Sequence, residues 1–275
     1  MKKENLKLIQ DLESGKCPGP DAQSRIQNLL DDAVKNEEIE TLNLFLTSVP
    51  KDSEWGIGVK AGAWWQTYCK KIVLPALNKI QGERKDPQIT EHIIEALCLS
   101  YYKHPETGRD GDFESHAFAL IKSGLAIDKD KISKILNKTI AELNWGNFPW
   151  IKVVELLRTE RIKDSSESVI KGFIRRSNTR PFVNMKLNDD LICTIHAICD
   201  LGYNGSNKFI EELLNNEDYK RTAIRAVGSY GDKTNLKVLK KQLGHIFTKP
   251  EKEKYARMDL KRAIKEIKAR ESVND

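Results

Sequence analysis

The sequence predicts an all-α protein built from short helices that pack as antiparallel pairs, and three observations support this prediction. Apolar residues recur at spacings of three and four along almost the whole chain, which is the periodicity of amphipathic helices. No convincing run alternates apolar and polar residues as a half-buried strand would. The joints between the apolar stripes are short and rich in Gly, Asn, Asp and Pro, which favours antiparallel neighbours over distant crossovers.

The apolar stripes place the helices in order along the chain. The clearest stripes lie at 26–34, 39–46, 93–101, 132–143, 153–157, 169–174 and 191–198. Asp21 stands where an N-cap is expected before the first of them. Asp164 with Glu167, and Thr248 with Glu251, have the spacing of a capping box and predict two further helix starts.

The chain is expected to form one continuous domain. Its 275 residues are enough for one large domain or two ordinary ones, and no low-complexity linker interrupts them. We therefore predict a single helical domain over 1–275. Within it, 1–185 is expected to hold irregular or capping helix pairs, and 186–275 the clearest repeats.

Composition indicates a soluble chain, since 39% of residues are hydrophobic and 31% are charged. No apolar run approaches the length needed to cross a bilayer, and Glu4, Asp11 and Glu13 interrupt the N-terminal stretch that could act as a signal peptide. The number of cysteines is odd, and reduced thiols are expected. These features predict a cytoplasmic protein.

Charge is distributed unevenly along the chain. Residues 1–150 hold 20 Lys and Arg against 22 Asp and Glu, and residues 151–275 hold 26 against 18. A basic face in the second half could meet an acidic protein surface or a nucleic acid. The simpler alternative is a solvated helical surface made soluble by lysines.

The second half also contains an internal repeat. Residues 195–214 align with 221–240 at an offset of 26, so that glycines and cap residues match as well as apolar positions. The matches are Ala197 with Ala223, Ile198 with Ile224, Leu201 with Val227, Gly202 with Gly228, Gly205 with Gly231, Ser206 with Asp232, Ile210 with Leu236 and Leu213 with Leu239. A weaker third copy lies at 261–267. Helical pairs of this kind must stack on their neighbours to bury their apolar faces.

The junction in this repeat carries a family resemblance. Residues 221–243 read RTAIRAVGSYGDKTNLKVLKKQL. This stretch resembles the repeat junction of HEAT-like (armadillo-type) α-helical repeat proteins, in which a small-residue inner helix ends in a Gly-x-x-Gly-Asp turn before the next outer helix. The resemblance implies an α-solenoid, a right-handed superhelix of antiparallel helix pairs, that binds macromolecules along a concave surface of inner helices.

The stretch WGIGVKAGAWWQTYCKK at 55–71 suggests a phosphate loop only superficially. A dinucleotide fingerprint needs GxGxxG after a strand, and neither the spacing nor a strand is present. Close helix packing explains the glycines better. Trp64 and Trp65 are adjacent rings that cannot both face the core of one helix, so one of them is a candidate contact residue.

Two other clusters resemble metal sites but lack the required spacing. Cys193 and Cys199 flank His196 on an expected helix, where the two sulfur atoms would be about 9 Å apart along the axis. The loop residues RDGDFESH at 109–116 lack the bidentate Glu of a calcium loop. No nucleophile, zinc or phosphate-loop motif is present, so we expect no metal and no cofactor.

Arginines are the most suggestive candidates for binding. The candidate positions are Arg175, Arg176, Arg180, Arg221 and Arg225, with Lys220 beside the last two and Lys261 and Lys265 in the weaker repeat. If the repeats stack, these side chains could form a ladder across inner helices. Arginine forks suit carboxylates and phosphates equally.

The leading hypothesis is a non-enzymatic solenoid that binds an acidic protein surface through these arginines and an exposed tryptophan. An adaptor or a bacterial toxin-neutralising immunity protein fits that description. The alternative is a nucleic-acid-binding HEAT-like protein, including one of the alkylpurine DNA glycosylase type, whose catalytic residues have no placed counterpart in this chain. The sequence leaves the oligomeric state and the identity of the partner open.

Overall fold

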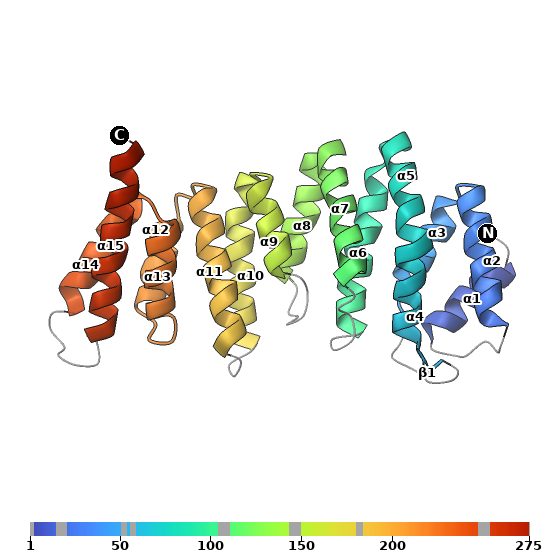
Figure 1. Cartoon of the computed structure of the whole chain (residues 1–275), viewed down its shortest axis with the longest axis horizontal. Coiled ribbons are helices and arrows are strands. Elements are labelled where there is room, and N and C mark those ends of the chain that lie inside the picture. Colours follow the sequence, from blue (N-terminus) through green and yellow to red (C-terminus); the bar gives the residue numbers. More distant parts are fainter. Residues whose placement is uncertain are drawn as a thin grey trace. The chain divides into compact units, whose positions relative to one another are not determined.

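Figure 1 shows a computed structural model of the chain. The structure describes residues 3–14, 21–50, 54–55, 59–103, 111–142, 150–179, 184–246 and 254–274. The prediction of an all-α fold is confirmed, because helices account for almost all of these residues. One antiparallel pair of two-residue strands, β1 (Glu54–Trp55) and β2 (Val59–Lys60), interrupts the helices. Within the described residues, no helix is long and apolar enough to cross a membrane.

The chain divides into two compact units, Met1–Leu136 and Asn137–Asp275. This boundary falls within helix α8 (Lys129–Glu142), well before the change at 185 that the repeats suggested. The single domain over 1–275 stays a prediction.

Helices of unit 1 surround a mainly aliphatic core that contains the aromatic side chains of Phe45, Trp65 and Phe113. They are α1 (Lys3–Glu13), α2 (Ala22–Lys35), α3 (Ile39–Thr47), α4 (Ala61–Tyr68), α5 (Leu74–Arg84), α6 (Pro87–Lys103) and α7 (Gly111–Ile127), and a π-helical turn, Cys69–Val73, joins α4 to α5. Trp65 is fully buried, donates from its ring nitrogen to the carbonyl oxygen of Phe45 at 2.9 Å and lies 5.3 Å from the Phe113 ring. These contacts hold α3, α4 and α7 on one core.

Helices of unit 2 pack in a regular succession (Figure 1). They are α9 (Trp150–Thr159), α10 (Ser166–Thr179), α11 (Asn184–Asp200), α12 (Ser206–Leu214), α13 (Lys220–Tyr230), α14 (Leu236–Ile246) and α15 (Lys254–Asn274). Helix α11 contacts α9 and α13, and α13 contacts α15, so these four helices form a row. Helices α10, α12 and α14 each pack against a member of the row, and α12 also contacts α14. The superhelix and its handedness stay predictions.

The turn after α13 forms where the repeat motif predicts it. Helix α13 ends at Tyr230 and Gly231 follows in extended conformation. Asp232 caps the next short 3-10 turn, Lys233–Asn235, by accepting a hydrogen bond from the backbone N–H of Thr234 at 2.7 Å. The Asn235 side chain completes a capping box by accepting from the backbone N–H of Asp232 at 3.0 Å.

Gly228 differs from the expected hinge. It lies inside α13 and not at its end. A Cβ atom there would lie 2.8 Å from the Cβ atom of Ala263, so its role is to let α13 and α15 approach closely. Its partner in the alignment, Gly202, follows the end of α11 with a φ of +65° and closes that helix in the left-handed region. Aligned glycines thus serve two different purposes.

The predicted caps have mixed outcomes. Asp21 is the N-cap residue of α2, but its side chain makes no capping hydrogen bond. Asp164 lies inside a 3-10 turn, Lys163–Ser165, that precedes α10, so the expected capping box is wrong there. The predicted box at Thr248 and Glu251 lies outside the described residues.

Candidate functional site

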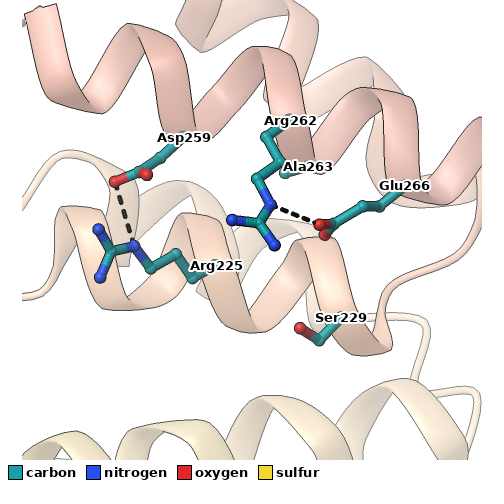
Figure 2. Close-up of a pocket in the computed structure, with 6 residues that line it drawn as sticks. All are labelled: Arg225, Ser229, Asp259, Arg262, Ala263 and Glu266. Atoms are coloured by element: carbon teal, nitrogen blue, oxygen red, sulfur yellow. Dashed lines mark hydrogen bonds and ion pairs between the residues drawn. The ribbon is translucent and has the colours of Figure 1, made fainter.

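A groove between α13 and α15 lies on the surface of unit 2 (Figure 2). Ala263, one of the lining residues, packs against Gly228, where the missing side chain brings the two helices together. Long side chains rise on both sides and enclose a cavity of about 380 Å³. The lining residues are Arg225 and Ser229 from α13, and Asp259, Arg262, Ala263 and Glu266 from α15.

Asp259 anchors two arginines of the neighbouring helix. Its Oδ2 atom lies 3.1 Å from Nε of Arg221 and 3.2 Å from Nε of Arg225. The Asp259 side chain is 15% exposed, whereas the two arginine side chains are 49% and 61% exposed. Because Asp259 engages the arginines through Nε, the terminal nitrogens of the forks stay available to a further acceptor. In Figure 2 the ion pair with Asp259 is drawn to Nε of Arg225, and no line reaches the two terminal nitrogens of that arginine.

Tyr255 extends the site along α15. The guanidinium carbon of Arg221 lies 5.3 Å from the centre of the Tyr255 ring, a cation–π contact. Tyr255 is 62% exposed, and Met258 on the same helix is 59% exposed. Arginine, tyrosine and methionine are thus exposed close together.

A second pair of charges lies on the far side of the groove. Nε of Arg262 lies 2.8 Å from Oε1 of Glu266, four residues along α15. The cavity is therefore lined by two guanidinium groups and two carboxylates. Such a lining suits a ligand that carries both donors and acceptors, as a protein surface does.

His196 sits in a polar cluster that links α9, α11 and α13. Its ring stacks on Tyr230 at 3.9 Å between ring centres, and its Nε2 lies 3.4 Å from Oδ2 of Asp200. The same carboxylate oxygen lies 2.8 Å from Nη1 of Arg158. Burial and, second, the charge of Arg158 lower the pKa of His196, although Asp200 opposes the shift. The imidazole is therefore neutral at pH 7.

The arginines of the predicted ladder are divided between the surface and the core. Arg175 is exposed on α10, whereas the adjacent Arg176 is buried and pairs with Asp190 of α11 at 2.8 Å. Arg176 also lies over the ring of Trp150, 5.3 Å from its centre. It therefore stabilises the interior of unit 2 and is not available to a partner. Arg180 lies outside the described residues.

The other predicted contact residues also differ from the expectation. Trp65 belongs to the core of unit 1, as its burial shows. The side chain of Trp64 lies outside the described residues. Lys220 is buried, with its ammonium group 2.8 Å from Glu217, so it stays close to its own helix and does not project toward a partner. Arg221 and Arg225 are thus the predicted positions that lie together on an exposed face.

The predicted cysteine and histidine cluster has no metal-site geometry. Among the described residues, no three His, Cys, Asp or Glu side chains are grouped so that they could hold a metal ion. Burial raises the pKa of the Cys193 and Cys199 thiols to about 12, so neither sulfur is a thiolate at pH 7. Gly56 and Gly58 of the phosphate-loop-like stretch, and Asp110 of the calcium-loop-like stretch, lie outside the described residues.

The sequence predicted Arg221 and Arg225, but not Arg262, Glu266 or the Asp259 that holds both predicted arginines. Asp259, Arg262 and Glu266 recur at spacings of three and four, which places them on one face of α15. That alternation of charge was a usable signal. The pairing of Asp259 with Arg221 and Arg225 was not readable from it, because the pairing spans two helices.

Comparison of the chain with protein-family models, with curated proteins and with solved structures finds no match.

Proposed function

We propose that this chain is a HEAT-like helical-repeat protein that binds an acidic surface of another protein through the face formed by α13 and α15. The observation that carries the proposal is the anchoring of Arg221 and Arg225 on Asp259 beside the exposed ring of Tyr255. Anchored arginines lose less conformational entropy on binding than free ones. Their terminal nitrogens can then donate to carboxylates of the partner.

Two features support the repeat class. The helices α9, α11, α13 and α15 pack in succession, with α10, α12 and α14 packed against them. The Gly231–Asp232 turn separates α13 from α14 where the repeat motif predicts it. A protein of this class uses side chains of successive helices as one continuous surface.

The composition of the site favours a protein partner over a nucleic acid. Arginine, tyrosine and methionine are enriched at the centres of protein interfaces. Asp259 and Glu266 stand among the arginines and would repel a phosphate backbone. A protein surface can instead place donors opposite these carboxylates. An adaptor and a toxin-neutralising immunity protein are two forms that this binding role could take.

The proposal is tested by reversing the charge of the two anchored arginines. Tagged wild-type protein and the Arg221→Glu/Arg225→Glu variant would be compared by co-purification of partners from the source cells, followed by mass spectrometry. The variant should lose a partner that the wild type recovers, by roughly thirtyfold or more, because hot-spot losses are about 2 kcal/mol or larger.

The control carries the same change of charge on α14. Lys237 and Lys240 are exposed there, and the Lys237→Glu/Lys240→Glu variant should recover the partner as the wild type does. All three proteins should share one helical circular dichroism spectrum. Equal loss in both variants would show that net charge, and not this face, governs binding.

Nucleic-acid binding is the second candidate, and the charge of unit 2 favours it. Residues 137–275 hold 27 Lys and Arg against 19 Asp and Glu. A mobility-shift assay with duplex DNA across a salt series tests it, since binding to phosphates weakens steeply as salt rises. Absence of a shift at low salt would exclude this candidate.

A further inference from the structure

Helix α15 carries a row of lysines on its outer side. Lys254, Lys261, Lys265 and Lys268 are all exposed, and Met258 lies within the row. Counted together with Met258, the five residues follow one another at spacings of four, three, four and three. These spacings keep them on one face of a helix. From 254 to 268 the row is about 21 Å long, at a rise of about 1.5 Å per residue. We call these five residues the lysine face.

The lysines of the lysine face are directed away from the groove, and Met258 lies between them and Tyr255. Ala263 marks the side of α15 that packs on α13, through its contact with Gly228. At about 100° per residue, Lys261, Lys265 and Lys268 lie roughly 140–200° around the helix from Ala263. They therefore face away from α13, at the end of the row of helices α9, α11, α13 and α15.

The charges of the lysine face are not neutralised, unlike those of the groove. Arg221, Arg225 and Arg262 each pair with a carboxylate. Within the described residues, no ion pair engages Lys254, Lys261, Lys265 or Lys268. A solvated helix face needs only polar side chains, which charges of both signs supply. Four charges of one sign along four turns instead favour an anionic partner.

We propose that the lysine face is a docking surface for an acidic amphipathic helix of a partner protein. Glutamates spaced three and four residues apart on such a helix would meet the lysines in register, as in the charged flanks of paired helices. Met258, with its flexible apolar side chain, would accept one apolar residue of the incoming helix. The methionine favours a protein helix over a phosphate backbone, because a phosphate backbone offers no apolar group to pack against it.

The test uses a defined probe. It is a fluorescent synthetic helix of about 18 residues, long enough to span the row. It carries glutamates at the spacing of the lysines and a leucine opposite Met258, and a second peptide replaces every glutamate by glutamine. Fluorescence anisotropy at low and at physiological salt would measure the affinity of both peptides. The wild type should bind the glutamate peptide at least tenfold more tightly than the glutamine peptide.

The decisive comparison is between two pairs of charge reversals. Lys261→Glu/Lys265→Glu should weaken binding of the glutamate peptide at least tenfold, whereas Lys237→Glu/Lys240→Glu on α14 should change it less than about threefold, the residual effect of net charge. A peptide in which lysines replace the glutamates should bind the Lys261→Glu/Lys265→Glu variant better than it binds the wild type. Met258→Ala should lower the affinity severalfold with no change in the salt dependence.

Three results would overturn the proposal. The first is no binding of the glutamate peptide by the wild type at low salt. The second is equal affinity of the two charge-reversal variants. The third is tighter binding of a duplex DNA of similar length, lost in Lys261→Glu/Lys265→Glu, which would assign the face to nucleic acid. Since the arginine variant of the groove leaves the lysine face intact, either proposal can fail without the other.

Discussion

The two units of this chain use charged side chains differently. Residues 1–136 hold 19 Lys and Arg against 21 Asp and Glu, whereas residues 137–275 hold 27 against 19. In unit 1, the ion pairs of Glu37 with Arg84 and of Glu91 with Lys131 lie in part-exposed positions. In unit 2, Arg176 and Asp190 are buried together, and Asp259 holds two arginines that are half exposed.

The difference between the two units lies in the polar contacts that join their helices. Both units join helices through aromatic contacts, Trp65 with Phe113 in unit 1 and Phe173 with Phe209 and Tyr219 in unit 2. The buried polar contacts of unit 1 include the neutral hydrogen bond of Gln81 to Thr90. Unit 2 uses ion pairs both inside and on its surface, so that some of its arginines are structural and others are presented. We infer that neighbouring arginines on a helix of this unit cannot be assigned a role by residue type alone.

The largest change in stability is expected from two substitutions to methionine, one in each unit. Together they test whether buried charge matters more in unit 2 than in unit 1. Arg176→Met removes the buried guanidinium that pairs with Asp190, and this loss of one member of a buried ion pair should cost about 3–5 kcal/mol of the free energy of unfolding. Gln81→Met removes a neutral donor to the hydroxyl of Thr90 but also the buried, unpartnered Oε1 atom of Gln81, so the loss should be only about 1 kcal/mol. Urea unfolding followed by circular dichroism measures both.

A control for Arg176 stands next to it. Arg175→Met removes the same side chain from an exposed position and should change stability by less than about 1 kcal/mol. Equal losses for Arg175→Met and Arg176→Met would contradict the division of the arginines into structural and exposed ones.

A smaller effect is expected from glycine substitutions in unit 2. A Cβ atom at Gly228 would lie 2.8 Å from Cβ of Ala263 and 2.9 Å from its Cα, so Gly228→Ala should push α13 and α15 apart. Overpacking costs about 1–3 kcal/mol, against a gain in helix propensity of about 1 kcal/mol, so thermal stability should fall.

The matched control is Gly244 in α14, where a Cβ atom would meet nothing within 4 Å. Gly244→Ala should raise the melting temperature, because only the gain in helix propensity remains. If Gly228→Ala were also stabilising, α13 and α15 would not be tightly packed at Gly228 and Ala263.

The smallest effect concerns pH. The pKa of His196 is lower in the folded protein than its ordinary value of 6.5, so the unfolded chain binds more protons as pH falls through this region. The contribution of His196 to stability is therefore fully present above pH 6.5 and is lost as pH falls from there toward the lowered pKa. His196→Gln should flatten the dependence of the unfolding free energy on pH between about 7.5 and 5.

His92→Gln, at a partly exposed position on α6, provides the comparison for unit 1. A slope that is equally steep in wild type and His196→Gln would assign the pH dependence to other groups.

Much of the fold was predictable because helix periodicity is a local property. The apolar stripes at 169–174 and 191–198 lie in α10 and α11, and Gly231 with Asp232 forms the predicted turn. The candidate site was predictable only in part. Arg221 and Arg225 were selected for their charge and position in the repeat, but Asp259 was not, since it lies 38 and 34 residues away on another helix.

The helical class and the turn at Gly231 were predictable from the sequence, because each depends on residues that are close along the chain. The excess of positive charge in the second half follows from composition alone. Only the tertiary structure decided that Arg176 is buried while Arg175 is exposed, and that Gly228 packs against Ala263. Adjacent residues on a helix point about 100° apart, and the neighbouring helix sets which of them meets the core. The same packing turned Trp65 inward and left Arg221 and Arg225 facing water.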